Sequence, residues 1–528
     1  MIRSLRHGVL LLSFALAACT PTAPTSAPAP GAPAAPAEQR EERQVLNVAV
    51  GSITANMTPA AAGGHWIRWH LYDTLTKFGP KFSIEPQVAT RWDLSADGLS
   101  WRWTIRPDLT FSNGDKLTAE DVAFSFTEMF ARNWPARANF INVVPDSVRA
   151  VDATTVEFAT RVPDVTVQAS TPLVFIIPKK YYESVGFEGF VQKPIGSSPY
   201  ELADYRADAL VTFRKRATPH PFRTPQNTEI TFRVVPDGGQ QINGLRTGEL
   251  DVLTVNTFTP DQLDAIQRAG GTTQFFKIST LAFFFPQGTL EARNSPLKDK
   301  RVRQALNYAV DREAITKLFR EAAVASQYAI PDSPYFNPAI QAYPYDPNRA
   351  KQLLAEAGYP NGFRVETGME FPSFTIKQEI ALAVQANLKA IGVEVEAIPL
   401  DFVQAATKGA GRGNELKAEL FGSVAGDTNG FISGIRQNIG CGKPVGAPPT
   451  ALWWCNQQWD RLLDQAYTER DPAKRTPLFH QAAQIMADDV PVMPLIIQPS
   501  HSAWSSKVKG VDMPYFFYFT LDSAYKVK

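Results

Sequence analysis

The sequence predicts a mixed α/β fold, preceded by a secretion signal and a flexible linker. Residues 45–50 (Val-Leu-Asn-Val-Ala-Val) have the composition of a buried strand. Trp101, Trp103 and Ile105 alternate with polar residues, as on a half-buried strand. Other segments carry apolar residues at helical spacing, and no internal repeat relates them.

Helix starts are marked by capping residues. Thr118 is followed three residues later by Asp121, which predicts a capping box at the start of a helix. Asp346 precedes Pro347 and an apolar stripe that stops near Gly358, the usual pattern of a capped helix closed by glycine. Further helices are expected over residues 65–75, over residues 297–319 and from Asp471 onward.

The N-terminus has the features of a secretory signal peptide over residues 1–18. Arg3 and Arg6 precede an apolar run over residues 9–18, which ends in small side chains. Ten residues of helix are ~15 Å long, about half the thickness of a bilayer's hydrocarbon core, so this run is too short to span a membrane.

Residues 16–19 (Leu-Ala-Ala-Cys) resemble a lipobox, in which Cys19 is lipidated and becomes the mature N-terminus. Residues 19–43 are rich in Pro, Ala, Thr and Ser and are expected to form an extended, solvated tether. The alternative is an ordinary signal peptide with an incidental Cys19. A lipid and a tether together predict a protein anchored to a membrane of the cell envelope through Cys19, with its folded part in the periplasm or at the cell surface.

Composition limits the class of partner. The chain has 528 residues, a formal charge of +1 and 44% hydrophobic residues, so it is long enough for two or three domains. Its near-neutral charge does not favour binding to nucleic acid or to an acidic membrane surface. No segment after the signal is apolar enough to span a bilayer, so a lipid would be the only membrane attachment.

Cys441 and Cys455 remain once Cys19 is set aside. In an oxidising compartment, two cysteines separated by a short loop predict a disulfide, worth about 3 kcal/mol in the chain-entropy model. Two buried free thiols are the alternative.

Catalytic motifs are absent from the sequence. It contains no G-x-S-x-G, H-E-x-x-H, C-x-x-C, P-loop or G-x-G-x-x-G pattern. His65 and His70 are five residues apart, which does not align them on one helix face as a metal pair requires. The missing motifs leave catalysis unsupported but do not exclude it; we expect a protein that is not an enzyme and that holds no cofactor or metal.

Ten segments in order resemble the family-5 extracellular solute-binding proteins, the dipeptide- and oligopeptide-binding group of ABC importers. The resemblance extends from about residue 45 to the C-terminus. The segments are residues 73–76, 86–92, 101–106, 111–122, 194–200, 248–251, 298–306, 350–359, 388–393 and 490–495.

The resemblance implies a two-lobed periplasmic-binding-protein-like fold (type II) with an additional third domain, and a ligand enclosed between the lobes. On this chain, the extra domain would be residues 79–181 and lobe II residues 278–498. Lobe I would combine residues 44–78, 182–277 and 499–528.

Peptide-binding members hold the ligand's α-ammonium on an aspartate in a Trp-x-x-Asp segment. Asp427 matches that aspartate, Gly426 beside it lets the backbone approach a ligand, and Ser423 or Val424 stands where the tryptophan would be. A carboxylate there would offset the lost hydration of the ammonium. The alternative for Asp427 is a turn residue that caps local amides.

Two other positions bear on the site. Ser198 occupies the second glycine of the Gly-Thr-Gly-Pro-Tyr motif that the resemblance leads us to expect. Trp66, in a segment that faces the cleft in the family, is a pocket candidate whose alternative is core packing; His65 beside it is a weaker candidate.

The resemblance implies a monomer that captures a peptide and delivers it to the permease subunits of an ABC importer. Alternatives are a non-peptide solute (oligosaccharide, opine, nickel chelate or haem) or a secreted hydrolase that reuses the fold.

Overall fold

The structure is a computed structural model, and the part of the chain that it describes belongs to one compact unit, Arg43–Lys528. The predicted signal peptide, the linker with Cys19, and Asp427 lie outside the described residues. The described residues are 44–61, 64–79, 83–256, 258–331, 333, 335–372, 376–400, 404, 418–426, 439–441, 454–513 and 519–527.

Local sequence signals account for several elements. Strand β1 (Val45–Val50) and strand β5 (Ser100–Ile105) lie where the apolar patterns predict them. Helix α2 (Ala119–Ala131) begins after Thr118, whose backbone N–H donates to Asp121 Oδ2 at 2.9 Å. Asp346 caps α9 (Pro347–Glu356) and Asp471 caps α14 (Pro472–Asp489), each by accepting a backbone N–H of the first turn.

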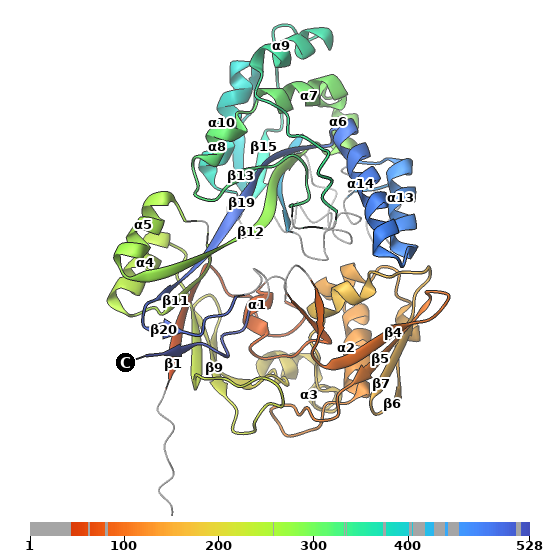
Figure 1. The fold of residues 1–528 in the computed structure, drawn as a ribbon, viewed down its shortest axis with the longest axis vertical. Coiled ribbons are helices and arrows are strands. Elements are labelled where there is room, and N and C mark those ends of the chain that lie inside the picture. The colour runs from red at the N-terminus through yellow and green to blue at the C-terminus, as the bar shows by residue number, and fades with distance from the viewer. Residues whose placement is uncertain are drawn as a thin grey trace, which may run out of the picture. The chain divides into compact units, whose positions relative to one another are not determined.

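The main sheet contains eleven strands among the described residues (Figure 1). Its order is β17-β15-β18-β12-β19-β11-β1-β10-β9-β8, and β13 pairs with β19. The strands not yet bounded are β17 (Ala397–Leu400), β15 (Met369–Pro372), β18 (Leu420–Gly426), β12 (Gly271–Phe284), β19 (Val492–Ser505), β11 (Val252–Asn256), β10 (Glu229–Val234), β9 (Leu210–Lys215), β8 (Tyr200–Arg206) and β13 (Ala323–Val324).

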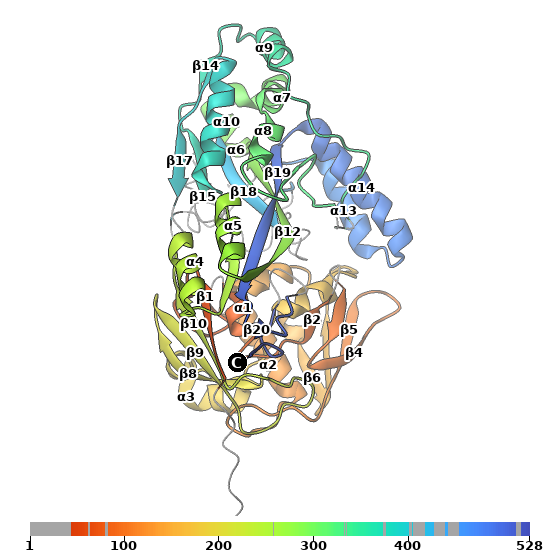
Figure 2. The same ribbon diagram turned by 60° about the vertical axis from the view of Figure 1, so that its left-hand side comes forward.

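Two long strands join the halves of this sheet. β12 and β19 pair antiparallel along their whole lengths, from Gly271 opposite Ser505 to Phe284 opposite Val492. One end of the pair adjoins β11, and the other adjoins β18 (Figure 2). Any motion of one half of the sheet against the other must therefore bend or twist β12 and β19.

Helices cover both faces of the sheet around β18. Leu281 and Phe283 of β12 pack with α7 (Lys300–Ala309), α9 and α10 (Gln378–Ala390) in one apolar cluster. Ala282 and Phe284 point to the other face, where they join α13 (Gln457–Thr468) and α14. This alternation along β12 is the period of two that a strand imposes.

The other half of the sheet shares its core with a second sheet. β1 contributes Leu46, Val48 and Val50 to a large cluster that includes Trp103 of β5. Ala49 faces the opposite side, towards α4 (Gly238–Thr247) and α5 (Pro260–Arg268). The second sheet has the order β4-β5-β7-β6, with β4 (Ala89–Leu94), β7 (Thr155–Ala159) and β6 (Arg149–Asp152).

Two expected helices are shorter than their patterns predict. The helix expected over residues 65–75 ends early, as α1 (His65–Arg68), because the chain extends at Thr74 to bridge Phe175. The helix expected over residues 297–319 is interrupted after α7. Asp311 there caps a new helix, α8 (Arg312–Thr316), because its carboxylate accepts the N–H of Ala314.

Among the described residues, no helix combines the length and apolar character that crossing a membrane would need.

The elements not yet bounded are β2 (Thr76–Phe78), β3 (Ile84–Pro86), β14 (Phe363–Arg364), β16 (Val393–Glu394), β20 (Val508–Lys509), β21 (Tyr525–Lys526), α3 (Lys179–Gln192), α6 (Gln287–Arg293) and the 3₁₀ helices Pro135–Asn139, Pro145–Ser147, Val167–Leu173 and Pro296–Lys298.

Candidate functional site

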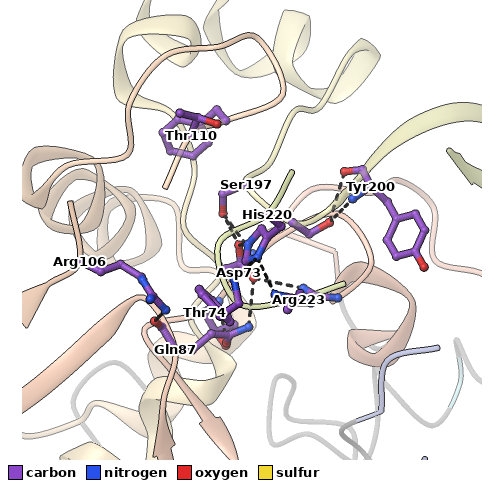
Figure 3. Close-up of polar contacts among 12 residues, drawn as sticks. Asp73, Thr74, Gln87, Arg106, Thr110, Ser197, Tyr200, His220 and Arg223 are labelled. Atoms are coloured by element: carbon purple, nitrogen blue, oxygen red, sulfur yellow. Dashed lines mark hydrogen bonds and ion pairs between the residues drawn. The ribbon is translucent and has the colours of Figure 1, made fainter. Parts of the chain in front are cut away.

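Three of the sequence motifs meet at one buried carboxylate, Asp73 (Figure 3). Oδ2 accepts a hydrogen bond from Ser197 Oγ at 2.9 Å and lies 3.1 Å from His220 Nε2. Oδ1 accepts from Gln87 Nε2 and from Arg223 Nη1, both at 3.1 Å. One polar network thus brings together the motifs at residues 73–76, 86–92 and 194–200.

The ionised form of Asp73 is strongly favoured in this network. Burial alone would raise the pKa of Asp73, but the charge and hydrogen bond of His220, the charge of Arg223 and the hydrogen bond from Ser197 together hold that pKa well below its usual range. Arg223 also pairs with Asp522 at 2.7 Å, so the network reaches the C-terminal segment. We call this network of Asp73, Gln87, Ser197, His220 and Arg223 the clamp, because it links segments that are distant in sequence.

Ser198 belongs to this clamp region and is fully buried. Its hydroxyl donates to the His70 carbonyl at 2.6 Å and accepts from the Tyr200 N–H at 3.1 Å. A Cβ on the neighbouring Gly196 would lie 1.9 Å from the Leu71 carbonyl oxygen, so only glycine fits there. Ser198 stands where the resemblance leads us to expect glycine, and its hydroxyl links the backbone at His70 to the backbone at Tyr200.

His70 is a structural histidine, and its hydrogen bonds define its tautomer. The backbone N–H of Leu521 donates to Nε2 at 3.2 Å, so Nδ1 carries the proton and donates to the Trp66 carbonyl at 3.1 Å. Burial is the main cause that lowers the pKa of His70 to about 4.

A pH dependence of stability follows from His70. Between pH 6.5 and about 4 the unfolded chain binds a proton that the folded chain does not, so the free energy of unfolding should fall as the pH falls through this window, by about 3 kcal/mol for this group. In urea unfolding from pH 7 to 4.5, His70→Gln should show a shallower pH slope than the wild type. His480→Gln, at a half-buried position, is the control. Equal slopes for wild type and His70→Gln would refute this assignment.

Polar side chains are concentrated where β12 and β19 pass between the halves of the sheet. Ser279 of β12 lies opposite both Gly426 of β18 and Gln498 of β19. Ser279 is 5% exposed and Gln498 is 6% exposed. The β12–β19 register shifts between Lys277 and Ser279, beside this row. The row Gly426–Ser279–Gln498 thus places two buried polar side chains where the two halves of the sheet join.

One loop bridges the two halves beside this row. Glu321, which has a positive φ of 59°, places Oε2 2.9 Å from His501 Nε2 of β19. The adjacent Arg320 pairs with Asp264 of α5 at 2.7 Å. The loop after α8 is therefore attached to both β19 and α5, across the segment that must deform if the halves move.

The sequence-predicted site residues are only partly described. Gly426 is the last residue of β18 and lies in the polar row, whereas Asp427 and the side chain of His65 lie outside the described residues. Trp66 is half-buried in α1 and packs against the large apolar cluster around β1, as its core-packing alternative expects.

Cys441 and Cys455 are joined in the structure, with their Cα atoms 4.5 Å apart. The Cys441 N–H donates to Asp460 Oδ2 of α13 at 2.8 Å. The disulfide thus lies at the start of α13, next to the buried Trp454. The structure pairs the same two cysteines that the sequence leads us to expect.

Sequence reasoning missed the polar row and the clamp around Asp73. The only signal for the row was a polar run, residues 498–502, within an otherwise apolar strand. Nothing local linked His220 or Arg223 to Asp73. In the described part of the chain, no group of three or more His, Cys, Asp or Glu side chains is placed to hold a metal ion.

Residues 83–430 match the family model described as bacterial extracellular solute-binding proteins, family 5 Middle. The chain belongs to this family. Heme-binding protein A of Haemophilus influenzae is 27% identical over 478 residues, covering 83% of this chain and 84% of that protein. Glutathione-binding protein GsiB of Escherichia coli (strain K12) is 26% identical over 484 residues, covering 88% of this chain and 91% of that protein.

Solved structures share the fold of this family-5 protein. A dipeptide-binding protein from Pseudoalteromonas sp. SM9913, in complex with Met-Leu, aligns with a TM-score of 0.79 at 23% identity, covering 92% of this chain and 100% of that chain. DppA from Helicobacter pylori with the peptide STSA and AgaA from A. tumefaciens R10 with agropinic acid each align with a TM-score of 0.78, at 22% and 20% identity, covering 92% of this chain and 99% of theirs. The type II periplasmic-binding-protein fold is thereby confirmed.

Proposed function

We propose that this family-5 solute-binding protein of an ABC importer captures peptides and delivers them to the permease. The observation that carries the proposal is the polar row Gly426–Ser279–Gln498, which lies where β12 and β19 pass from one half of the sheet to the other. A solute held there would contact the strands that must bend when the lobes close, so binding and closure would be coupled.

The boundary between the proposed lobes falls where β12 and β19 pass from one half of the sheet to the other. Lobe I would comprise residues 44–78, 182–277 and 499–528, lobe II residues 278–498, and the extra domain residues 79–181. Both crossing strands pass the proposed boundaries at Lys277 and Gln498, next to the register shift in β12. The extra domain shares an apolar cluster with the strands of lobe I, which would make those two parts move together.

Asp427 would bind the α-ammonium of the peptide, and Gly426 would let the ligand approach the end of β18. Gly426 has no side chain to obstruct that approach, and Ser279 of β12 lies directly opposite it. Trp66 would contribute an apolar surface from lobe I.

Mass spectrometry of material extracted from the denatured, purified protein would test the peptide assignment. Peptides with free amino termini are the expected result. Relatives named for haem and glutathione, and one bound to agropinic acid, define the competing outcomes. Recovery of haem or an opine-like acid in place of peptides would refute the peptide assignment while leaving the family unchanged.

We further propose that Cys19 carries a lipid that anchors a monomeric protein to a membrane of the cell envelope. Cys19→Ala should move the protein from the membrane fraction to the soluble extracytoplasmic fraction, without changing ligand affinity, because a linker separates Cys19 from the folded unit. Cell fractionation with immunoblotting measures this, with Thr20→Ala as the control. A Cys19→Ala protein that stays in the membrane fraction would contradict lipidation.

A further inference from the structure

A cavity lined mainly by apolar side chains lies among β19, α13, α14 and residues 326–329 and 335–343. Its volume is about 70 Å³. One water molecule needs roughly 10–15 Å³, and well-packed protein interiors leave few spaces of this size. Its lining includes Tyr328, Tyr335, Trp459, Phe479, Met486 and Val492.

Specific hydrogen bonds hold the cavity wall formed by residues 326–331 and 335–343 in place. Gln327 Nε2 donates to the Asn337 carbonyl at 2.7 Å, and the Asn337 N–H donates to Gln327 Oε1 at 3.0 Å. Asn337 Nδ2 donates to the His480 carbonyl of α14 at 3.1 Å. Gln327 and Asn337 are both buried, so the wall is ordered before any ligand arrives.

The cavity adjoins β18, the strand that ends at Gly426. The hydroxyl of Tyr328 lies 3.5 Å from Ser423 Oγ, and its ring packs edge-on against Phe284 with centroids 4.9 Å apart. Burial raises the pKa of Tyr328 to about 12, so its hydroxyl is neutral. Three residues of strand, about 10 Å, separate Ser423 from Gly426, a distance that about three residues of an extended peptide span.

The lining also restricts the chemistry of an occupant. The described residues that line the cavity carry no charge. A charged group would lose its hydration there without a counter-charge, whereas an apolar group would gain from leaving water. The aromatic rings of Tyr335 and Phe479, edge to face at 4.3 Å, offer further contacts to a planar ligand group.

We propose that this cavity is a specificity pocket of the solute site, which accepts an uncharged aromatic or branched apolar group of the bound solute. The proposal rests on the proposed function, because it assumes that the solute lies at the end of β18. It predicts a preference for peptides with at least one large apolar side chain.

Filling the cavity tests the proposal. Ala483 of α14 lines the cavity and is half-buried, so Ala483→Leu should reduce its volume without unfolding the protein. Ala473→Leu, the same change at an exposed position of α14, is the matched control. Calorimetry would compare tri-alanine with the three tripeptides that carry one Phe and two Ala, and would use indole as a probe of the cavity alone.

In the wild type and in Ala473→Leu, one Phe-containing tripeptide should bind at least about tenfold tighter than tri-alanine, as expected for burial of one large apolar side chain. Ala483→Leu should lose most of that preference and most indole binding. A Phe preference unchanged in Ala483→Leu would overturn the pocket while leaving peptide binding intact. If no tripeptide binds, indole binding that Ala483→Leu removes would support an apolar pocket and refute only the peptide; absence of both would overturn the pocket as well.

Discussion

Asp73→Ala should lower the free energy of unfolding by about 3–5 kcal/mol, the usual cost of removing one partner from a buried ion pair. The substitution leaves Arg223, which is 8% exposed, without one of its two carboxylates, and it leaves His220, Ser197 and Gln87 each without an acceptor. Unpaired donors of this kind are costly because no water replaces the lost partner. Urea unfolding at pH 7 would measure the loss.

Controls separate the clamp from ordinary surface pairing. Asp204 pairs with Arg206 at an exposed site, so Asp204→Ala should cost under about 1 kcal/mol. Asp73→Asn keeps the shape and one acceptor oxygen and should fall between the two. A cost for Asp73→Ala no larger than that for Asp204→Ala would show that the network does not stabilise the fold.

The depressed pKa of Asp73 gives this contribution a pH window. Its stabilisation should be present above the ordinary pKa of an aspartate, about 4, and should be lost progressively as the pH falls below it. That window lies below the one for His70, so the two effects separate in a pH series.

Asp427→Asn should weaken peptide binding by about 2–5 kcal/mol, if the carboxylate holds a buried ammonium. N-acetylation of the peptide should cost the wild type a similar amount and cost the variant little more. Such non-additivity identifies a direct pair. Calorimetry with free and acetylated forms of one peptide measures all four affinities.

A surface carboxylate again provides the control, and Asp204→Asn should leave all these affinities unchanged. Equal affinity of the wild-type protein for free and acetylated peptide would show that the amine is not the anchor. Asp427 would then be a turn residue, and non-peptide solutes such as haem or opines would become the better candidates.

Helix starts and apolar strands were predictable because their causes are local. Thr118, Asp346 and Asp471 each precede a helix in the structure, since a capping side chain satisfies amides only two or three residues away. The interruption after α7 was not predicted. Residues 297–319 keep helical spacing across it, but Asp311 prefers to cap, and Arg312 uses its guanidinium to bind the Pro494 carbonyl at 2.7 Å.

The candidate site was only partly predictable, because most of its residues come together only in the tertiary structure. The resemblance pointed to the end of β18, and Gly426 lies in the polar row there. Ser279 and Gln498 gave no recognisable motif, because their significance comes from lying in one row with Gly426 across three strands that are distant in sequence. The cavity beside Tyr328 likewise depends on how the chain around Asn337 is held against α14.

The sequence by itself determined the family, the mixed α/β class and the capped helices, because ordered motifs and local hydrogen-bonding preferences are written in neighbouring residues. Only the tertiary structure decided what the motif residues do. Asp73 meets His220 and Arg223, 147 and 150 residues further along the chain, and there it becomes part of a clamp. Its partners there keep Asp73 ionised against the effect of burial, whereas burial keeps His70 neutral, since a pKa depends on the surrounding dielectric and partners, which no local pattern encodes.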